Sequence, residues 1–414
     1  MRKIFVAVLL FIAAPLLATN GYFTHGQGTL SKAMAGSNTA FAQEALDVES
    51  NPAAAAFIPN GYSLSLALFS PDRQYTVTGN PSQAPQTFGL APGTVKSESK
   101  LFPMPSFGFL YRPHTADAIA LNFVARGGMN TDYRTNTFYG GTHTGVDLAQ
   151  AFLTGTYARR ITANQSLGIT VVVAGQRFKA TGLEAFAPYS SDPSALSNNG
   201  YDTSYGAGVR VGYLARPVPN VAIGAAWAPR IKMTELKKYR GLFAQGGRFD
   251  VPTSASAGIA YTVVNPLTLS LDWERIHYND VRSVGNAMLP NLGSSPLGTF
   301  EGAGFGWKDI NVAKLGLQWR ATDTWTWRAG FSKGDQPIPS TEVLFNILAP
   351  GVIEKHFTAG GTMALNDRGK FNFALMYAPN KTVKGANPLE VPGQQSIALR
   401  MHEWEAEFGY SFGF

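Results

Sequence analysis

Two kinds of residue in this 414-residue chain could do covalent chemistry, a serine in a hydrolase-like motif and a set of histidines. Gly330, Ser332 and Gly334 match the Gly-x-Ser-x-Gly pattern, which in α/β-hydrolases places the nucleophile on a sharp turn between a strand and a helix. Pro337 and Pro339 follow closely, and no helical period does. The motif is therefore better explained as a chance match at the end of a strand.

The histidines are six and dispersed, and none lies at a metal-ligand spacing from another: His25, His114, His143, His277, His356 and His402. The chain also contains no cysteine, which excludes disulfides and thiolate metal sites. We expect no cofactor, no metal and no enzymatic activity. A hydrolase built from residues far apart in the sequence stays open, because catalytic triads are set by space.

Charged residues occur at alternate positions of strand-like runs, which would place them on one face. Asp272, Glu274, Lys314 and Arg328 fall on the polar faces of three consecutive runs. They predict cross-strand ion pairs, with carboxylate recognition as the alternative. Glu403, Glu405 and Glu407 form an acidic row on the last run, and such a row needs cationic neighbours or water.

Apolar residues gather in segments that otherwise look like loops. Exposed apolar patches usually bind a ligand or pack against a neighbour. We expect a hydrophobic ligand to be captured by these residues, with simple packing over the mouth of the fold as the alternative. The candidates are Leu242, Phe243, Met288, Leu289, Leu344, Phe345, Ile347 and Leu348.

The elements that would position these groups are strands. From Trp404 to the terminal Phe414, bulky apolar residues alternate with small or charged ones, with the period and length of a strand that crosses a bilayer at a tilt. Similar runs recur along the chain. Fourteen are marked, at 61–78, 100–113, 117–131, 147–161, 166–180, 201–215, 220–233, 250–263, 267–281, 308–320, 324–334, 353–365, 370–381 and 397–414.

Connections between these runs alternate strictly between short and long. Those after even-numbered runs are brief, as at 113–116 and 366–369, and those after odd-numbered runs are long. Outer-membrane barrels have brief periplasmic turns and extended outside loops. The fold class is therefore all-β, a 14-stranded antiparallel transmembrane β-barrel, which closes so that no backbone edge meets lipid. A large soluble β-protein is the alternative.

The first sixty residues do not look like strands. Residues 1–18 read as a signal peptide, with Arg2 and Lys3 before a short apolar run and Ala18 at the cleavage point. Residues 19–60 are rich in Gly and Ala and cannot build a core of their own. We expect them to form a hatch that plugs the lumen of a barrel made by 61–414; a flexible periplasmic tail is the alternative.

The net charge is +7, or +5 once Arg2 and Lys3 are removed with the signal peptide. No dense basic tract suggests a nucleic-acid partner. One cluster stands out, made of Lys232, Lys237, Lys238 and Arg240. It favours attraction to anionic lipid or carboxylated ligands, or it is a solvated loop.

Several short motifs resemble the FadL-type outer-membrane transporters of fatty acids and other hydrophobic compounds. The matching stretches are 26–28, 32–36, 47–53, 306–309 and 325–330, together with the last strand that ends on Phe. The resemblance covers nearly the whole mature chain. It implies that the hatch includes Gly26, Gly28, Gly36, Asn51, Pro52 and Ala53.

The same resemblance implies an exit for ligand through the barrel wall beside a kinked third strand. Gly127 and Gly128 lie in the third run, and consecutive glycines permit a bulge, so we nominate them as the kink. An ordinary strand end is the alternative. The implied function is passive passage of fatty acids or hydrocarbons from outer loops to an internal pocket and sideways into the membrane.

The remaining expectations concern partners. We expect contacts with outer-membrane lipid and lipopolysaccharide, recognition of the last strand and Phe414 by the barrel-assembly machinery, and a monomer in a Gram-negative outer membrane. A porin for polar solutes is the main alternative function, and a surface adhesin or an outer-membrane hydrolase is a further one.

Overall fold

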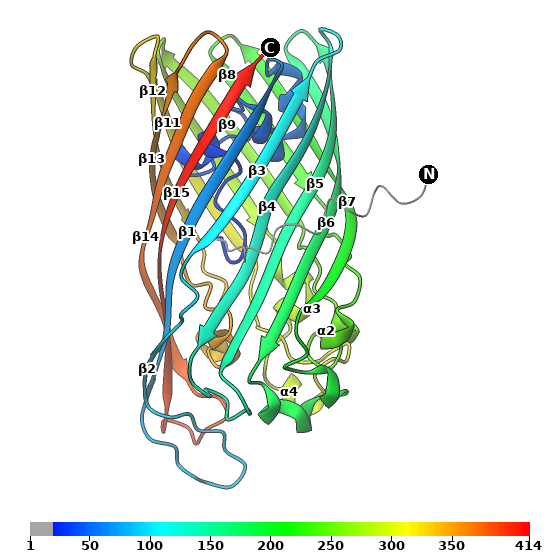
Figure 1. Ribbon diagram of the computed structural model, residues 1–414, viewed down its shortest axis with the longest axis vertical. Helices are drawn as coiled ribbons and strands as arrows, with labels where there is room; N and C mark the ends of the chain where they lie inside the picture. The colour runs from blue at the N-terminus through cyan, green and yellow to red at the C-terminus, as the bar shows by residue number, and fades with distance from the viewer. Residues whose placement is uncertain (1–19) are drawn as a thin grey trace.

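The computed structural model describes residues 20–414 and is a closed antiparallel β-barrel (Figure 1). Each wall strand pairs with its neighbour in the sequence, and β15 pairs with β1 from Gly61–Gly413 to Thr78–Ser396, which closes the cylinder. The predicted signal peptide, 1–18, lies outside the described residues. The wall strands are β1 (Gly61–Thr78), β3 (Phe102–Tyr111), β4 (Asp117–Tyr133), β5 (Thr144–Thr162), β6 (Gln165–Thr181), β7 (Asp202–Val218), β8 (Val221–Ala228), β9 (Ser254–Val264), β10 (Leu267–Ile276), β11 (Ile310–Arg320), β12 (Trp325–Gly334), β13 (Lys355–Ala364), β14 (Gly369–Ala386) and β15 (Ser396–Gly413).

The prediction of a 14-stranded barrel is confirmed. A fifteenth strand of four residues, β2 (Gly93–Lys96), pairs with residues 74–77 of β1, beyond the part of β1 that pairs with β3. The largest differences in strand length concern β14, which continues to Ala386 and not 381, and β8, which ends at Ala228 and not 233. Pro229 follows β8 directly, and proline has no N–H to continue the ladder.

Side chains alternate between the two faces of the wall as the period of two requires. On β15, Trp404 is 55% exposed on the outer surface, whereas Glu405 is 4% exposed and faces the lumen. Leu64, Leu66 and Leu68 on β1 point outward in the same way. The outside is therefore an apolar belt and the inside is polar, as expected for a barrel in lipid.

The connections sort to the two ends of the cylinder. Short turns of two to five residues lie at the end that holds the C-terminus, here called the turn end (top of Figure 1). The seven long connections lie at the opposite loop end, which the sequence predicts to face outward. They carry α2 (Ala244–Gly247), α3 (Arg282–Gly285), α4 (Asn291–Ser294) and the 3-10 helices η3 (Glu184–Tyr189), η4 (Pro193–Ala195), η5 (Lys237–Tyr239), η6 (Tyr278–Asp280), η7 (Ser340–Glu342) and η8 (Phe345–Ile347).

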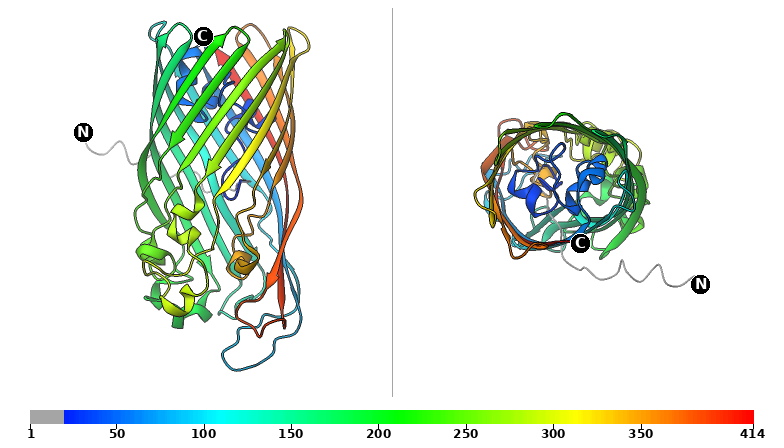
Figure 2. Two further views of the ribbon diagram at one scale, coloured as in Figure 1. Left: turned by 180° about the vertical axis from the view of Figure 1, so that it is seen from behind. Right: turned by 90° about the horizontal axis from the view of Figure 1, so that it is seen from above.

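Residues 20–60 lie inside the barrel, and the view along its axis shows them within the ring of strands (Figure 2). This hatch contains α1 (Thr29–Ala33), η1 (Ala45–Glu49) and η2 (Pro52–Phe57), and nearly all of its residues are buried. Among residues 20–414, no helix is long and apolar enough to cross a membrane.

Candidate functional site

A narrow apolar cavity of about 40 Å³ lies under the connections at the loop end. Its lining comes from two wall strands and four different long connections, and Ser283 supplies the one side-chain polar group. No lysine, arginine or carboxylate lines it. The lining residues are Val146, Phe178, Leu183, Phe186, Leu196, Leu242, Phe243, Ser283, Leu297, Ala303, Gly304, Phe305, Phe345 and Leu348.

Four of the predicted ligand residues line this cavity, namely Leu242, Phe243, Phe345 and Leu348. The other four do not. Met288, Leu344 and Ile347 are completely buried in the surrounding core, and Leu289 is 39% exposed. The ligand assignment of all eight stays a prediction.

Sequence reasoning missed ten of the fourteen lining residues, including Phe178 and Phe186. Phe178 sits on β6 at an inward position, between the outward Arg177 and Lys179. A large aromatic on the lumen face beyond the apolar belt was a usable signal, because lumen positions nearer the hatch are small or polar.

Aromatic rings continue from the cavity toward the hatch. The ring centroids of Phe178 and Phe243 are 4.6 Å apart, those of Phe243 and Phe249 are 5.1 Å apart, and those of Phe249 and Tyr22 are 5.7 Å apart. Tyr22 and Phe23 follow at 5.1 Å. All five rings are almost completely buried. A continuous row of packed aromatic rings, here called the apolar path, therefore runs from the cavity at the loop end to the first described residues of the hatch.

The barrel wall is incomplete where this path ends. β3 pairs with β4 only from Phe107–Phe123 to Tyr111–Ile119. The two chain segments meet again farther out, where the N–H of Glu98 donates to the Asp132 carbonyl at 2.8 Å. Between these points the β3–β4 ladder is missing. Two prolines, at 103 and 105, lie in the unpaired part of β3 and have no N–H to offer.

The hatch occupies the missing part of the ladder. The N–H of Gly128 donates to the Tyr22 carbonyl at 2.9 Å, and the N–H of Thr24 donates to the Arg126 carbonyl at 3.3 Å. Residues 22–24, here called the strap, thus act as a short substitute strand against β4. The β4 register shifts between Ala125 and Gly127, and a Cβ added at Gly127 would overlap the Tyr22 carbonyl oxygen.

The predicted glycine pair therefore lies where hatch and wall meet. Gly127 faces the lumen and permits the close approach of the strap, and Gly128 supplies a backbone donor to it. The role of these glycines as an exit stays a prediction.

Polar contacts fix the rest of the hatch. The Nζ of Lys32 lies 3.0 Å from Glu405 and 2.7 Å from Glu407, so this one cation forms ion pairs with two members of the acidic row. Burial alone would lower the pKa of Lys32, but the charges of Glu405 and Glu407 outweigh it and raise that pKa above its usual range. On the opposite wall, Arg210 pairs with Glu49.

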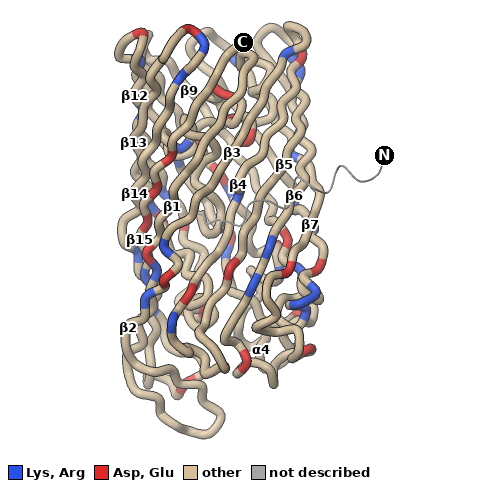
Figure 3. The backbone as a smooth tube through the Cα atoms, viewed as in Figure 1, with Lys and Arg blue, Asp and Glu red and all other residues tan. Residues whose placement is uncertain are grey.

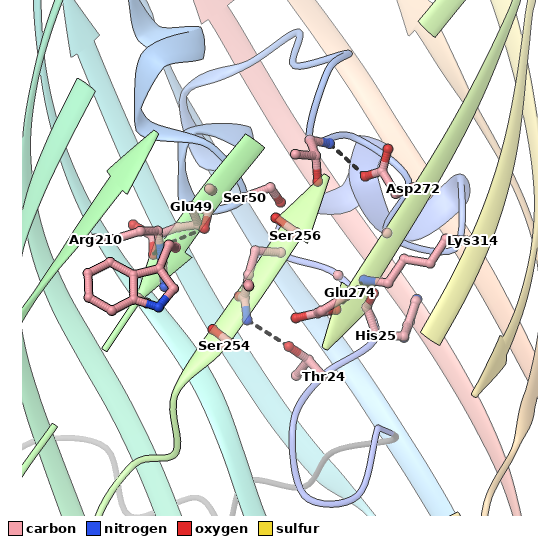
Figure 4. A pocket seen from close by; sticks show the side chains of 18 of the residues that line it. Thr24, His25, Glu49, Ser50, Arg210, Ser254, Ser256, Asp272, Glu274 and Lys314 are labelled. Atoms are coloured by element: carbon pink, nitrogen blue, oxygen red, sulfur yellow. Dashed lines mark hydrogen bonds and ion pairs between the residues drawn. The ribbon is translucent and has the colours of Figure 1, made fainter. Parts of the chain in front are cut away.

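The predicted polar strand residues divide between ion pairing and hatch binding. Lys314 forms the expected pair with Glu274 on the neighbouring strand, at 2.7 Å. Asp272 instead accepts the backbone N–H of Thr39 in the hatch at 2.7 Å. Arg328 donates to neutral groups, among them Thr362 at 2.7 Å. Asp272, Glu274 and Lys314 border a small polar cavity between hatch and wall (Figure 4), which differs in chemistry from the apolar one, whereas Arg328 borders a separate polar space at the turn end.

The hatch motif residues make close contacts. The Asn51 side-chain amide donates to the carbonyls of Thr39 and Tyr213, both at 2.9 Å, and its oxygen caps η2 by accepting the Ala53 N–H. Pro52 opens that helix. Three glycines allow close chain contacts: Gly26, Gly28 and Gly36, of which the last two have positive φ.

The serine motif lies flat in the wall. Residues 330–334 all belong to β12, so the turn and helix of a nucleophile elbow do not follow. Ser332 and His356 are hydrogen-bonded at 2.8 Å and both are buried. Within residues 20–414, no group of three or more His, Asp or Glu side chains could hold a metal ion.

Comparisons with known proteins give a family and a fold. The family model described as "Outer membrane protein transport protein (OMPP1/FadL/TodX)" matches residues 17–401. No curated protein matches the chain. The solved structures similar to it include the Pseudomonas putida toluene transporter TodX (16% identity, 96% of this chain and 100% of that one, TM-score 0.66), a Pseudomonas aeruginosa FadL homologue (15%, 95% and 100%, 0.69) and the Ralstonia pickettii toluene transporter TbuX (18%, 94% and 99%, 0.61). At these identities the likeness establishes the barrel fold.

Proposed function

Because the chain belongs to the outer membrane transport protein family of OMPP1, FadL and TodX, we propose that it is a passive outer-membrane channel for hydrophobic small molecules. The observation that carries the proposal is the continuous apolar path from the cavity at the loop end to the strap at the β3–β4 opening. The loop end faces the outside, and the opening releases the ligand sideways into the membrane. The cavity of about 40 Å³ is smaller than the roughly 150 Å³ that holds benzene, so the apolar connections over it must separate to receive the ligand.

The cavity favours neutral ligands over fatty acids. A carboxylate taken out of water needs a cation or several donors, and the lining supplies neither. Two of the similar solved structures are described as toluene transporters. We therefore propose aromatic or aliphatic hydrocarbons as the substrate class.

Binding in such a cavity is weak enough for onward transport. A compact aromatic molecule buries about 150–250 Å² of surface, similar to an aromatic side chain. At about 25 cal/mol per Å² this corresponds to about 4–6 kcal/mol, or dissociation constants of about 1 mM to 0.04 mM. Transfer from water through the cavity to lipid then needs no energy source, because the ligand's apolar surface leaves water in the first step and does not return to it.

The porin alternative is less well supported because the hatch fills the lumen. A polar space of about 610 Å³ opens at the turn end, and residues of the hatch, among them Gln43 and Glu44, form part of its lining. The adhesin and hydrolase alternatives have no supporting feature among the described residues. We also propose that the assembly machinery recognises β15 with Phe414, and that the barrel is a monomer.

The first test removes the cavity's aromatic lining. Replacing Phe178 and Phe243 with alanine is expected to lower uptake of radiolabelled toluene by cells about tenfold or more, because two ring contacts with the ligand are lost. Phe300→Ala is the matched control, since Phe300 lies on the same end of the barrel but is 54% exposed and stacks on Arg282. Equal uptake by both variants would contradict the assigned cavity.

The second test asks whether the whole hatch must move. The hydroxyl oxygens of Ser37 in the hatch and Ser270 in β10 are 3.0 Å apart, and the chain has no native cysteine. A Ser37→Cys/Ser270→Cys pair should therefore form one disulfide that ties the hatch to the wall. Lateral release predicts normal toluene uptake in the oxidised protein, because only the strap must move. Loss of uptake that a reductant restores would show passage along the lumen instead.

A further inference from the structure

Four cations lie in two neighbouring pairs on the outer surface of β12 to β15, near the loop end. Lys333 on β12 and Lys355 on β13 are directly opposite each other in the register, and both are exposed. On β14 and β15, Thr382 faces Arg400, and Lys384 is the next outward residue on β14. These four residues, Lys333, Lys355, Lys384 and Arg400, are here called the outer basic patch.

The patch carries charge that the protein itself does not neutralise. Like charges directly opposite on neighbouring strands repel each other and destabilise the pair. Within residues 20–414, none of the four side chains forms an ion pair, and Arg400 donates only to the neutral amide oxygen of Asn380, at 2.9 Å. A site that keeps such repulsion is suited to an anion.

Three carboxylates lie near the patch. Asp335, two residues beyond Lys333, is exposed and accepts the backbone N–H and the side-chain amide of Asn311. Glu354 is 2.6 Å from Lys381, so its charge is already matched. Asp72 on β1 is opposite His402, one outward step from Arg400. The patch therefore keeps an excess of positive charge even when all three carboxylates are counted, since Lys381 already matches Glu354.

The position of the patch relative to the membrane is set by its aromatic neighbours. Phe331 and Phe357, each two residues from a patch lysine on the same face, have ring centroids 5.1 Å apart. Tyr377 and Trp404 form a second outward pair at 4.3 Å. Aromatic residues mark the borders of the apolar belt in barrels of this kind. The cations thus lie just beyond the outer border, and Figure 3 shows charged residues along this part of β14 and β15.

We propose that the outer basic patch binds the phosphate groups of the phosphorylated glycolipid of the outer leaflet, lipopolysaccharide. Its acyl chains would lie against the apolar belt and the aromatic pairs, and its phosphates would bridge Lys333 with Lys355 and reach Arg400. Charge-assisted contacts of Lys and Arg with phosphate supply the affinity. The proposal depends on the outer-membrane location of the barrel and not on the ligand route.

A second basic cluster provides a matched control. Lys232, Lys237, Lys238 and Arg240 carry the same charge in a connection at the loop end. Two of them are already engaged, since Arg240 pairs with Asp192 and the Nζ of Lys238 donates to the Tyr201 carbonyl at 2.8 Å. This cluster has no comparable aromatic pairs at the edge of the belt.

The experiment compares two fourfold glutamine variants of the detergent-purified protein. One replaces Lys333, Lys355, Lys384 and Arg400, and the other replaces Lys232, Lys237, Lys238 and Arg240. Native mass spectrometry measures binding of bis-phosphorylated lipid A, of monophosphoryl lipid A and of inorganic pyrophosphate. Four contacts near an anionic lipid surface predict at least about tenfold weaker lipid A binding in the first variant. The second variant should bind within about twofold of the parent protein.

The three ligands distinguish binding of the whole lipid from binding of phosphate alone. Monophosphoryl lipid A should bind the parent protein more weakly than lipid A, and pyrophosphate at equal concentration should not displace lipid A. Unchanged lipid A binding in the patch variant, or equal loss in both variants, would overturn the proposal, as would efficient competition by pyrophosphate. Gels run with and without heating check that each variant is folded, through the resistance of the folded barrel to heat denaturation. Toluene uptake should be normal in the patch variant, so failure here leaves the channel proposal intact.

Discussion

The two ends of the lumen are held together by different forces. Around the hatch, contacts are directional and charged, with Lys32 between two glutamates and Asp272 on a backbone N–H. Under the outer connections they are apolar and aromatic, as between Phe178 and Phe243. Hydrogen bonds and ion pairs fix one geometry, whereas apolar contacts are non-directional and tolerate rearrangement.

This difference suggests a division of labour. A plug that must stay in place gains from buried ion pairs, because each broken pair leaves an uncompensated charge. A mouth that must admit molecules of varied shape gains from contacts that can separate and re-form. The strap joins the two regions, since Tyr22 and Phe23 carry aromatic rings while their backbone pairs with β4.

Removal of the whole hatch should give the largest effect. Deletion of residues 20–56 is expected to leave the barrel folded, because the strands close on each other from β1 to β15. Planar-bilayer recordings should then show large steady currents where the parent protein shows little conductance. Unchanged conductance in a properly inserted deletion protein would mean that the hatch does not seal the lumen.

Removing the cation that holds the hatch to β15 should loosen the hatch without removing it. Lys32→Met leaves Glu405 and Glu407 buried without their cation, which costs about 3–5 kcal/mol for a buried pair. Hydrogen exchange of residues 29–49 should rise markedly. The triple variant Lys32→Met/Glu405→Gln/Glu407→Gln removes all three charges and should restore much of the protection. If the triple variant exchanges as fast as the single one, the charge argument is wrong.

Substitution of Gly127 and Gly128 tests the place where the hatch region and the apolar region meet. Gly127→Val/Gly128→Val adds branched side chains on both faces of the opening and forces the strap from its place on β4. We expect toluene uptake to fall severalfold while insertion stays normal. Gly155→Val is the control, because a Cβ at Gly155 on β5 meets nothing within 4 Å. Normal uptake in the double variant would remove these glycines from the exit.

The sequence predicted the wall better than the site. Alternation and the order of short and long connections are local properties of the chain, so the fourteen strands followed from them. The cavity is not local: Val146, Phe186 and Phe305 come from three distant segments, and only the closed barrel brings them together. The partner of Glu405 and Glu407 was equally hidden, since Lys32 lies more than 370 residues away in a segment without regular strands.

The smallest expected effect is a pH dependence of how firmly the hatch is held in the barrel. Burial, together with the charge of Asp47, raises the pKa of Glu44 to about 8. A carboxyl whose pKa is raised by folding stabilises the docked hatch while it is protonated, and this contribution is lost as the pH rises through the folded value. Burial also raises the pKa of Asp47, to about 6, and that group is mostly ionised above pH 6.5.

Glu44 and Asp47 titrate as a coupled pair, and between pH 6.5 and 8 Glu44 is the carboxyl of the pair that is expected to dominate the change. Burial lowers the pKa of His25, so this group opposes Glu44 only at lower pH, where an exposed histidine would become charged. Hydrogen exchange of residues 41–50, corrected for intrinsic rates, should increase severalfold from pH 6.5 to 8 in the parent protein. Glu44→Gln keeps the shape of the side chain but cannot ionise, and it should flatten the profile. A profile that keeps its slope in Glu44→Gln would mean that another group titrates. The pH dependence of the hatch would then not come from Glu44.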